Sequence, residues 1–106
     1  MRIDISLKHL DKSSILEEVI EKDIKKIERR LKIFKTDDAI HLSLHLEKNP
    51  HRDEYFCWIN MYLPSKVLKA QSRKNDVYLV INDAFSALLK QLDKLKYRLE
   101  RHLRKK

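Results

Sequence analysis

The sequence of 106 residues contains no glycine, and this absence is the strongest constraint on the chain. The GxGxxG dinucleotide turn, the Walker phosphate loop and the GxSxG nucleophile elbow all need glycine where the backbone bends sharply or approaches a phosphate. The sequence therefore excludes these three kinds of site. A single cysteine also excludes an internal disulfide and a CxxC metal site.

Charge is the second constraint. The sequence has 24 Lys and Arg against 16 Asp and Glu, a net charge of +8. Residues 22–35 hold seven bases and two acids, and residues 90–106 hold eight bases and two acids, so two segments carry the excess. Basic domains of this kind are typical of proteins that bind nucleic acids or acidic membrane surfaces. Because no apolar run approaches the about 20 residues that cross a bilayer, and no signal peptide is evident, we expect a cytoplasmic protein.

Alternating apolar and polar residues predict four strands, at 2–7, 39–47, 55–63 and 67–72. The last three have short connections, which favours an antiparallel sheet with one buried face. The strand residues predicted to face the core are Ile3, Ile5, Leu7, Ile40, Leu42, Leu44, Leu46, Tyr55, Cys57, Ile59, Met61, Leu63, Leu68 and Ala70.

Apolar residues at helical spacing predict two helices, from Ser14 to about residue 34 and from 76 to about 103. Ser14 to Glu17 fits a capping box, and Asn75 or Asp76 would cap the second helix. The predicted core positions are Leu16, Ile20, Ile24, Ile27, Leu31 and Phe34, then Val77, Ile81, Ala84, Leu88, Leu92, Leu95 and Leu99. The order β-α-β-β-β-α predicts one α+β domain over residues 1–106, with a four-stranded sheet, two helices packed on one face and a basic extension at about 100–106.

The second predicted helix carries a basic stripe. At 100° per residue its members are separated by 4, 4, 3 and 4 residues and share one side, whereas Asp93 and Glu100 fall on the opposite flank. The stripe comprises Lys90, Lys94, Arg98, Arg101 and Lys105. Like charges four residues apart destabilise a helix, so the stripe indicates an anionic partner. The alternative is a solvated face that keeps the protein soluble.

The first predicted helix repeats this pattern, with bases opposite its apolar positions. They are Lys22, Lys25, Lys26, Arg29 and Lys32. Two basic faces on one layer of helices could straddle a groove lined by phosphates.

The chain resembles the ribosome hibernation promoting factor and ribosome-associated inhibitor family along essentially its whole length. The most specific match is Asp76-Val77-Tyr78 followed by Ile81, which opens the last helix of that family. The segments that carry the resemblance are Arg2–Asp11, Lys25–Arg29, Asp76–Ile81 and Lys90–Lys96. The family has the same β-α-β-β-β-α fold. Its matched basic positions are Lys25, Lys26, Arg29, Lys90, Lys94 and Lys96.

The resemblance implies a protein that binds rRNA of the small ribosomal subunit near the decoding region, occludes the mRNA and tRNA sites and inhibits translation. It implies no cofactor, no membrane and no small-molecule substrate, and it leaves open whether ribosomes are silenced singly or paired into dimers. With the helix stripes, the expected RNA-binding residues are Lys22, Lys25, Lys26, Arg29, Lys90, Lys94, Lys96, Arg98 and Arg101.

The chain departs from the family pattern at four places. Ala87 replaces a frequent lysine, which removes one expected phosphate contact. Ser14 replaces a helix-opening proline, and the turn at residues 64–66 lacks glycine. The chain ends in residues 104–106, which are all basic, without an acidic tail or a further domain, and this favours the short promoting-factor form.

Catalytic and metal chemistry find little support in the residues. His41 and His45 would lie roughly 13 Å apart on a strand, too far to share one metal ion. Cys57 is predicted to face the core as a structural thiol. The acids form no evident acid/base pair, so we expect no enzyme activity.

Phe56, Trp58 and Tyr62 should face the side of the sheet opposite the helices. There they could stack on bases of single-stranded RNA, stabilise the sheet by cross-strand pairing, or form a self-association patch. The alternative function is therefore a small dimeric or protein-binding module that uses this aromatic sheet face.

Overall fold

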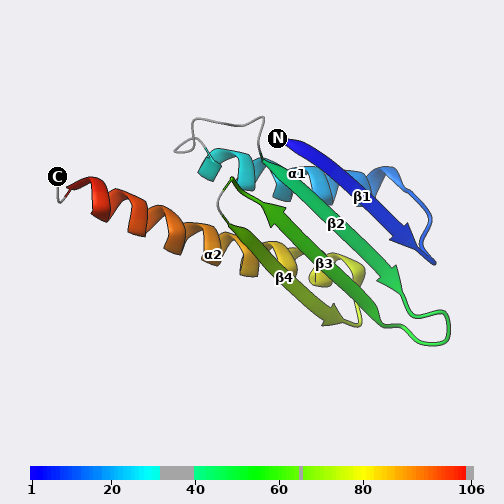
Figure 1. The fold of residues 1–106 in the computed structure, drawn as a ribbon. Helices are drawn as coiled ribbons and strands as arrows, with labels where there is room; N and C mark the ends of the chain where they lie inside the picture. The colour runs from blue at the N-terminus through cyan, green and yellow to red at the C-terminus, as the bar shows by residue number, and fades with distance from the viewer. Residues whose placement is uncertain (32–39, 65, 105–106) are drawn as a thin grey trace.

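The computed structural model describes residues 1–31, 40–64 and 66–104, and it confirms the predicted β-α-β-β-β-α order (Figure 1). The six elements are β1 (Arg2–Lys8), α1 (Ser14–Arg30), β2 (His41–Lys48), β3 (Tyr55–Tyr62), β4 (Val67–Lys74) and α2 (Val77–Arg104). The strands form one sheet in the order β1-β2-β3-β4.

The sheet is mixed. β2, β3 and β4 pair antiparallel, as the short connections predicted, whereas β1 pairs parallel with β2. Parallel neighbours need a crossover, and α1 supplies it by returning the chain across one face of the sheet. β4 extends two residues beyond its predicted end, to Lys74.

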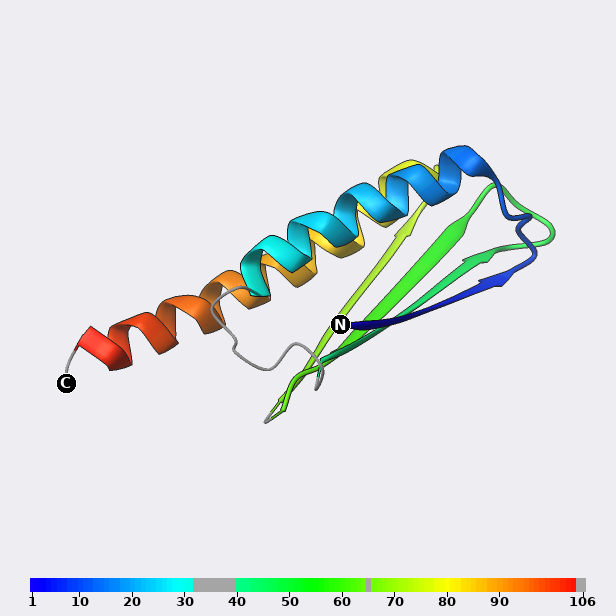
Figure 2. The same ribbon diagram turned by 90° about the horizontal axis from the view of Figure 1, so that it is seen from above.

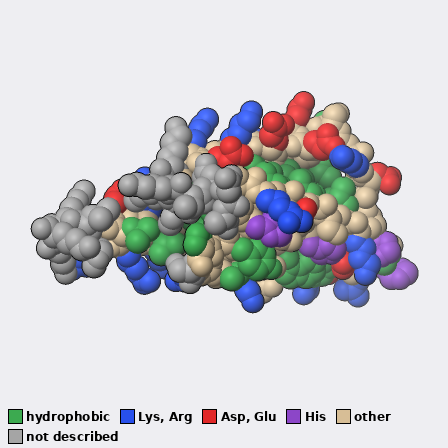
Figure 3. Space-filling model, turned by 45° about the horizontal axis from the view of Figure 1, so that its top comes forward, with side chains coloured by type: hydrophobic (Ala, Val, Ile, Leu, Met, Phe, Trp, Pro, Cys, Tyr) green, Lys and Arg blue, Asp and Glu red, His purple; other side chains and the backbone are tan. Residues whose placement is uncertain are grey.

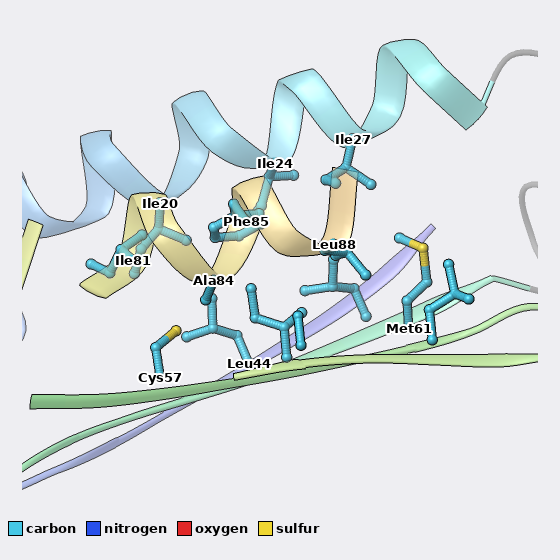
Figure 4. Packing of buried hydrophobic residues seen from close by; sticks show 14 of the residues in the cluster. Ile20, Ile24, Ile27, Leu44, Cys57, Met61, Ile81, Ala84, Phe85 and Leu88 are labelled. Carbon is cyan, nitrogen blue, oxygen red and sulfur yellow. The ribbon is translucent and has the colours of Figure 1, made fainter. Parts of the chain in front are cut away.

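Both helices lie on the same face of the sheet, so the opposite face is left open (Figure 2). The core lies between these layers, where side chains from both helices point toward the strands (Figure 4). Every predicted core residue of β2 is buried, as are Cys57, Ile59 and Met61 of β3. Val80 and Phe85 of α2 are also buried, and the sequence pattern did not assign them.

Two predicted core residues are exposed. Ile5 of β1 is 48% exposed and Leu99 of α2 is 37% exposed, and both predictions were wrong. Ile5 lies on the edge strand β1, where it lines an open hollow of about 440 Å³ with Leu16 and Ile20 of α1 and is not covered by their side chains. Leu99 is exposed because α2 extends past the end of the sheet (Figure 1). Tyr55 is only partly buried, and Phe34 lies outside the described residues.

The helix caps agree in part with the prediction. Asp76 caps α2, since its Oδ1 accepts hydrogen bonds from the backbone N–H groups of Tyr78 and Leu79 at 2.8 and 3.1 Å. For α1 the cap is Ser13 rather than Ser14, because the Ser13 Oγ accepts from the N–H of Leu16 at 3.1 Å. α1 ends at Arg30, and the predicted last turn at 32–34 lies outside the described residues.

Candidate nucleic-acid interface

The main cationic surface is a band of four exposed side chains on α2, here called the α2 band. Its members are Lys90, Lys94, Arg98 and Arg101. Within the described part of the chain, none of the four forms an ion pair within 4 Å, so their charges are available to a partner. Lys105, predicted to extend this stripe, lies outside the described residues.

Two contacts fix the direction in which the α2 band points. Arg30 Nε of α1 lies 3.2 Å from Asp93 Oδ1 of α2, which places α1 against the acidic flank of α2. On another side of α2, Gln91 Nε2 donates to the backbone carbonyl of Lys69 in β4 at 2.7 Å. Because the basic stripe is on the flank opposite Asp93, the α2 band points away from α1. Lys96, six residues after Lys90, shares the Asp93 flank and stands apart from the band.

The basic side chains of α1 form a second surface, the α1 cluster, consisting of Lys22, Lys25, Lys26 and Arg29. They line a shallow hollow of about 320 Å³ together with Glu18 and Glu21. Its acids neutralise part of its charge. Lys25 Nζ lies 3.8 Å from Glu21 Oε1, and Lys26 Nζ lies 3.6 Å from Asp23 Oδ1. The α1 cluster is therefore weaker as an anion-binding surface than the α2 band. Lys32 lies outside the described residues.

Asp23 is the buried acid beneath this cluster. The residue is 4% exposed, and its Oδ2 atom has no hydrogen-bond partner among the described residues. Burial raises the pKa of the Asp23 carboxyl above its ordinary value, while Lys26 and then Lys22 act in the opposite direction. Sequence reasoning treated this residue only as part of a charge count. The signal was its spacing, three residues after Ile20 and four before Ile27.

Cys57 is fully buried on the inner face of β3, as predicted. Burial, with a smaller contribution from the charge of Asp23, raises the pKa of the Cys57 thiol to about 12. The thiolate needed for a nucleophile is therefore absent near neutral pH.

The open face of the sheet carries the predicted aromatic side chains in cross-strand rows. From β1 to β4 the rows are Arg2-His41-Tyr62-Val67, Asp4-Ser43-Asn60-Lys69, Ser6-His45-Trp58-Gln71 and Lys8-Glu47-Phe56-Arg73. Figure 3 shows histidine side chains beside hydrophobic ones on this sheet, with charged side chains among and around them. The three predicted aromatic residues therefore share one face, opposite the helices.

Ring contacts run both along these rows and between them. His41 stacks on Tyr62 with centroids 5.4 Å apart, and His45 is tilted against Trp58 at the same distance. Phe56 and Trp58 stack at 5.6 Å with an angle of 11° between their planes. The two histidine contacts are the cross-strand pairs that one of the three predicted roles of this face requires.

The two histidines have separate polar partners. His41 Nε2 lies 2.6 Å from Asp4 Oδ2, and His45 Nε2 lies 3.3 Å from Glu47 Oε1. Among the residues with described positions, no three His, Cys, Asp or Glu side chains are grouped as a metal site would require. No helix formed by these residues has the length and apolar character needed to traverse a bilayer.

The fold is shared with solved structures from two bacteria. A ribosomal subunit interface protein from Coxiella burnetii has a TM-score of 0.71 and 24% identity, covering 92% of this chain and 99% of that one. The N-terminal domain of Protein Y from Thermus thermophilus has a TM-score of 0.71 and 18% identity, covering 90% and 99%. A search of curated protein sequences gave no match.

The family of this chain is shown by its amino-acid sequence. Residues 3–105 match the family described as sigma 54 modulation protein / S30EA ribosomal protein. This match covers nearly all of the chain, includes both basic helices and agrees with the resemblance read from the motifs. The chain therefore belongs to the sigma 54 modulation protein / S30EA ribosomal protein family.

Proposed function

We propose that this protein is a ribosome hibernation factor. It binds rRNA of the small ribosomal subunit near the decoding region, occupies space that mRNA and tRNA need, and so inhibits translation in the cytoplasm. Its family membership supports the ribosome as partner. The observation that carries the proposal is the α2 band, whose four exposed cations have no ion pairs within the described residues.

Phosphate is the anion that such a band fits best. Aligned cations on one side of a helix repel one another by a few tenths of a kcal/mol per pair, so an unpaired band is disfavoured in the free protein. Binding to RNA relieves this repulsion and releases the counterions condensed on the RNA. The α1 cluster adds to the attraction, although Glu21 and Asp23 reduce its contribution.

Shape supports inhibition by occlusion. The molecule measures 55 × 22 × 20 Å, and the 28 residues of α2 form a rod of roughly 40 Å that projects beyond the sheet. Phosphate contacts position a protein without reading base sequence, so the shape of an rRNA-walled channel would select this rod. The proposal needs no covalent step, and the buried Cys57 thiol is unsuited to one.

Competition with tRNA tests occlusion directly. The protein is bound to small subunits, initiator tRNA and mRNA are added in increasing amounts, and bound protein is measured after sedimentation. We expect tRNA and mRNA to displace the protein. We also expect a high-salt wash to restore translation by the same ribosomes.

Two outcomes would contradict the proposal. Simultaneous binding of tRNA and protein at full affinity would exclude occlusion. Activity that stays lost after all protein has been removed would indicate an enzyme. The same gradients show whether ribosomes pair, since dimers sediment ahead of single ribosomes.

A further inference from the structure

A hollow of about 430 Å³ lies on the open face of the sheet, between β3 and β4. It is lined by Phe56, Trp58, Gln71, Ser72 and Arg73. Its volume is within the range of about 300–1,000 Å³ found for small-molecule pockets. Because both helices cover the other face of the sheet, this hollow is separate from the α2 band and the α1 cluster.

The aromatic wall of the hollow is already arranged as a stack. Phe56 and Trp58 are nearly parallel, at 11°, with centroids 5.6 Å apart. The Arg73 guanidinium carbon lies 5.6 Å from the centroid of the Phe56 ring, and Arg73 Nε is held 3.2 Å from Glu54 Oε2. A flat ligand could therefore stack here on prearranged groups, which lowers the ordering cost of binding.

The polar groups beside the rings suit a nucleotide. Among the described residues, the Gln71 amide makes no side-chain hydrogen bond and Lys69, two residues earlier on β4, makes no ion pair. Both belong to the outward-facing series of β4 that ends with Arg73. The amide offers donors and an acceptor to a base edge, and the lysine offers a positive charge to a phosphate.

We propose that this hollow binds an unpaired nucleobase of single-stranded RNA. The base stacks on the Phe56–Trp58 pair, the Gln71 amide meets its edge, and Lys69 attracts the adjoining phosphate. Charge favours RNA over a second copy of the chain, since two molecules of net charge +8 repel each other whereas RNA is attracted. This site would add contacts on the face opposite the helices.

Trp58 is the only tryptophan in the chain, so its fluorescence reports on this hollow without a label. The probe is a single-stranded adenosine octamer of RNA, compared with an abasic backbone of the same length. We expect the octamer to quench Trp58 fluorescence in a saturable way. The abasic backbone should cause little quenching, because it has phosphates but no bases to stack.

Two variants that keep Trp58 test the contacts. Phe56→Leu retains an apolar side chain and removes one of the two stacked rings, and Lys69→Gln removes the charge assigned to the phosphate. Each should weaken octamer binding by roughly tenfold. Lys66→Gln is the matched charge control, since Lys66 is exposed beside β4 and does not line the hollow. Thermal unfolding checks that each variant is folded.

Three results would overturn the proposal. One is octamer binding without quenching, and another is equal quenching by the abasic backbone. The third is a change in fluorescence that depends on protein concentration alone and accompanies a dimer in sedimentation, which would make the hollow a self-association surface. The experiment contains no ribosomes, and quenching of Trp58 reports on the hollow rather than on the α2 band, so failure of this proposal can be distinguished from failure of the proposed function.

Discussion

The outer surface of α2 and the open face of the sheet both carry several cations, but the two surfaces differ in whether those cations form ion pairs. On the sheet face three of the four outward cations have acidic neighbours, and Lys69 is the exception among the described residues. Arg2 Nε lies 3.5 Å from Asp4 Oδ2, Lys8 Nζ lies 3.8 Å from Glu47 Oε1, and Arg73 Nε lies 3.2 Å from Glu54 Oε2. On α2 the members of the α2 band have no such partners among the described residues. The number of bases on a surface therefore says less about phosphate binding than whether those bases are already paired.

The same comparison holds for aromatic groups. The sheet face has stacked rings and a hollow beside them, whereas no aromatic side chain belongs to the α2 band. Phosphates need unpaired positive charge, and bases need flat apolar surfaces. The two faces therefore suit different parts of an RNA chain, and variants on each face should separate the two contributions.

Reversing charge on the α2 band should have the largest effect. We expect the double variant Lys90→Glu, Lys94→Glu to bind small subunits roughly 100-fold more weakly. The slope of log affinity against log salt should also fall by about 2, because two phosphate contacts are lost. Sedimentation at several salt concentrations measures both quantities.

The matched control is the double variant Arg2→Glu, Lys8→Glu, which changes the net charge by the same amount on the sheet face. Since these two cations are already paired, we expect a loss of only a few fold. Equal losses for the two double variants would show that net charge alone governs binding, and the distinction between the surfaces would be wrong.

The buried Asp23 gives a smaller effect, on stability. Because its pKa is raised, the folded protein holds this proton more tightly than the unfolded chain does, so the ionised carboxyl costs stability as the pH rises above about 4. Asp23→Asn should therefore raise the free energy of unfolding by about 1 kcal/mol at pH 7. The gain should disappear below about pH 4, where the wild-type carboxyl is protonated.

Urea unfolding of the two proteins at pH 7 and at pH 3.5 checks this prediction. A less stable Asp23→Asn protein at pH 7 would mean that the ionised contact with Lys26 stabilises the fold. The variant also frees Lys26, 45% of whose side chain is exposed, so ribosome binding should not decrease.

Much of the fold could be predicted because periodicity reports which side of an element is apolar. Leu42, Leu44 and Leu46 alternate with polar residues, and all three are buried. Periodicity does not report where a neighbouring layer ends. Ile5 and Leu99 fit their patterns, yet they are exposed because one lies on an edge strand and the other beyond the sheet.

The candidate site was predicted less completely, for a related reason. A helical wheel shows that Lys90 and Lys94 share one side of α2, but the neighbour of each flank depends on tertiary packing. The contact between Arg30 and Asp93 joins residues 63 positions apart in sequence. It shows that α1 packs on the Asp93 flank, so the α2 band points away from α1. Phe85 is buried on the flank that faces α1, where it lies beside Val19 and Asp23. Likewise, the hollow beside Phe56 depends on the register between β3 and β4.

The smallest effect on ribosome binding is expected for Trp58→Ala. This variant tests how much the sheet face contributes beside the α2 band. If the α2 band provides most of the free energy of ribosome binding, loss of one stacking surface on the opposite face should change affinity by no more than a few fold. The same variant should bind the adenosine octamer roughly tenfold more weakly, because one stacking surface is lost while the α2 band still attracts the phosphates. This is measured with an end-labelled RNA because the tryptophan is gone. Its thermal unfolding must be compared with the wild type first, since Trp58 contacts both His45 and Phe56. A folded variant that loses ribosome binding as severely as the Lys90→Glu, Lys94→Glu protein would make the sheet face the principal interface. The α2 band would then serve only to attract RNA at a distance.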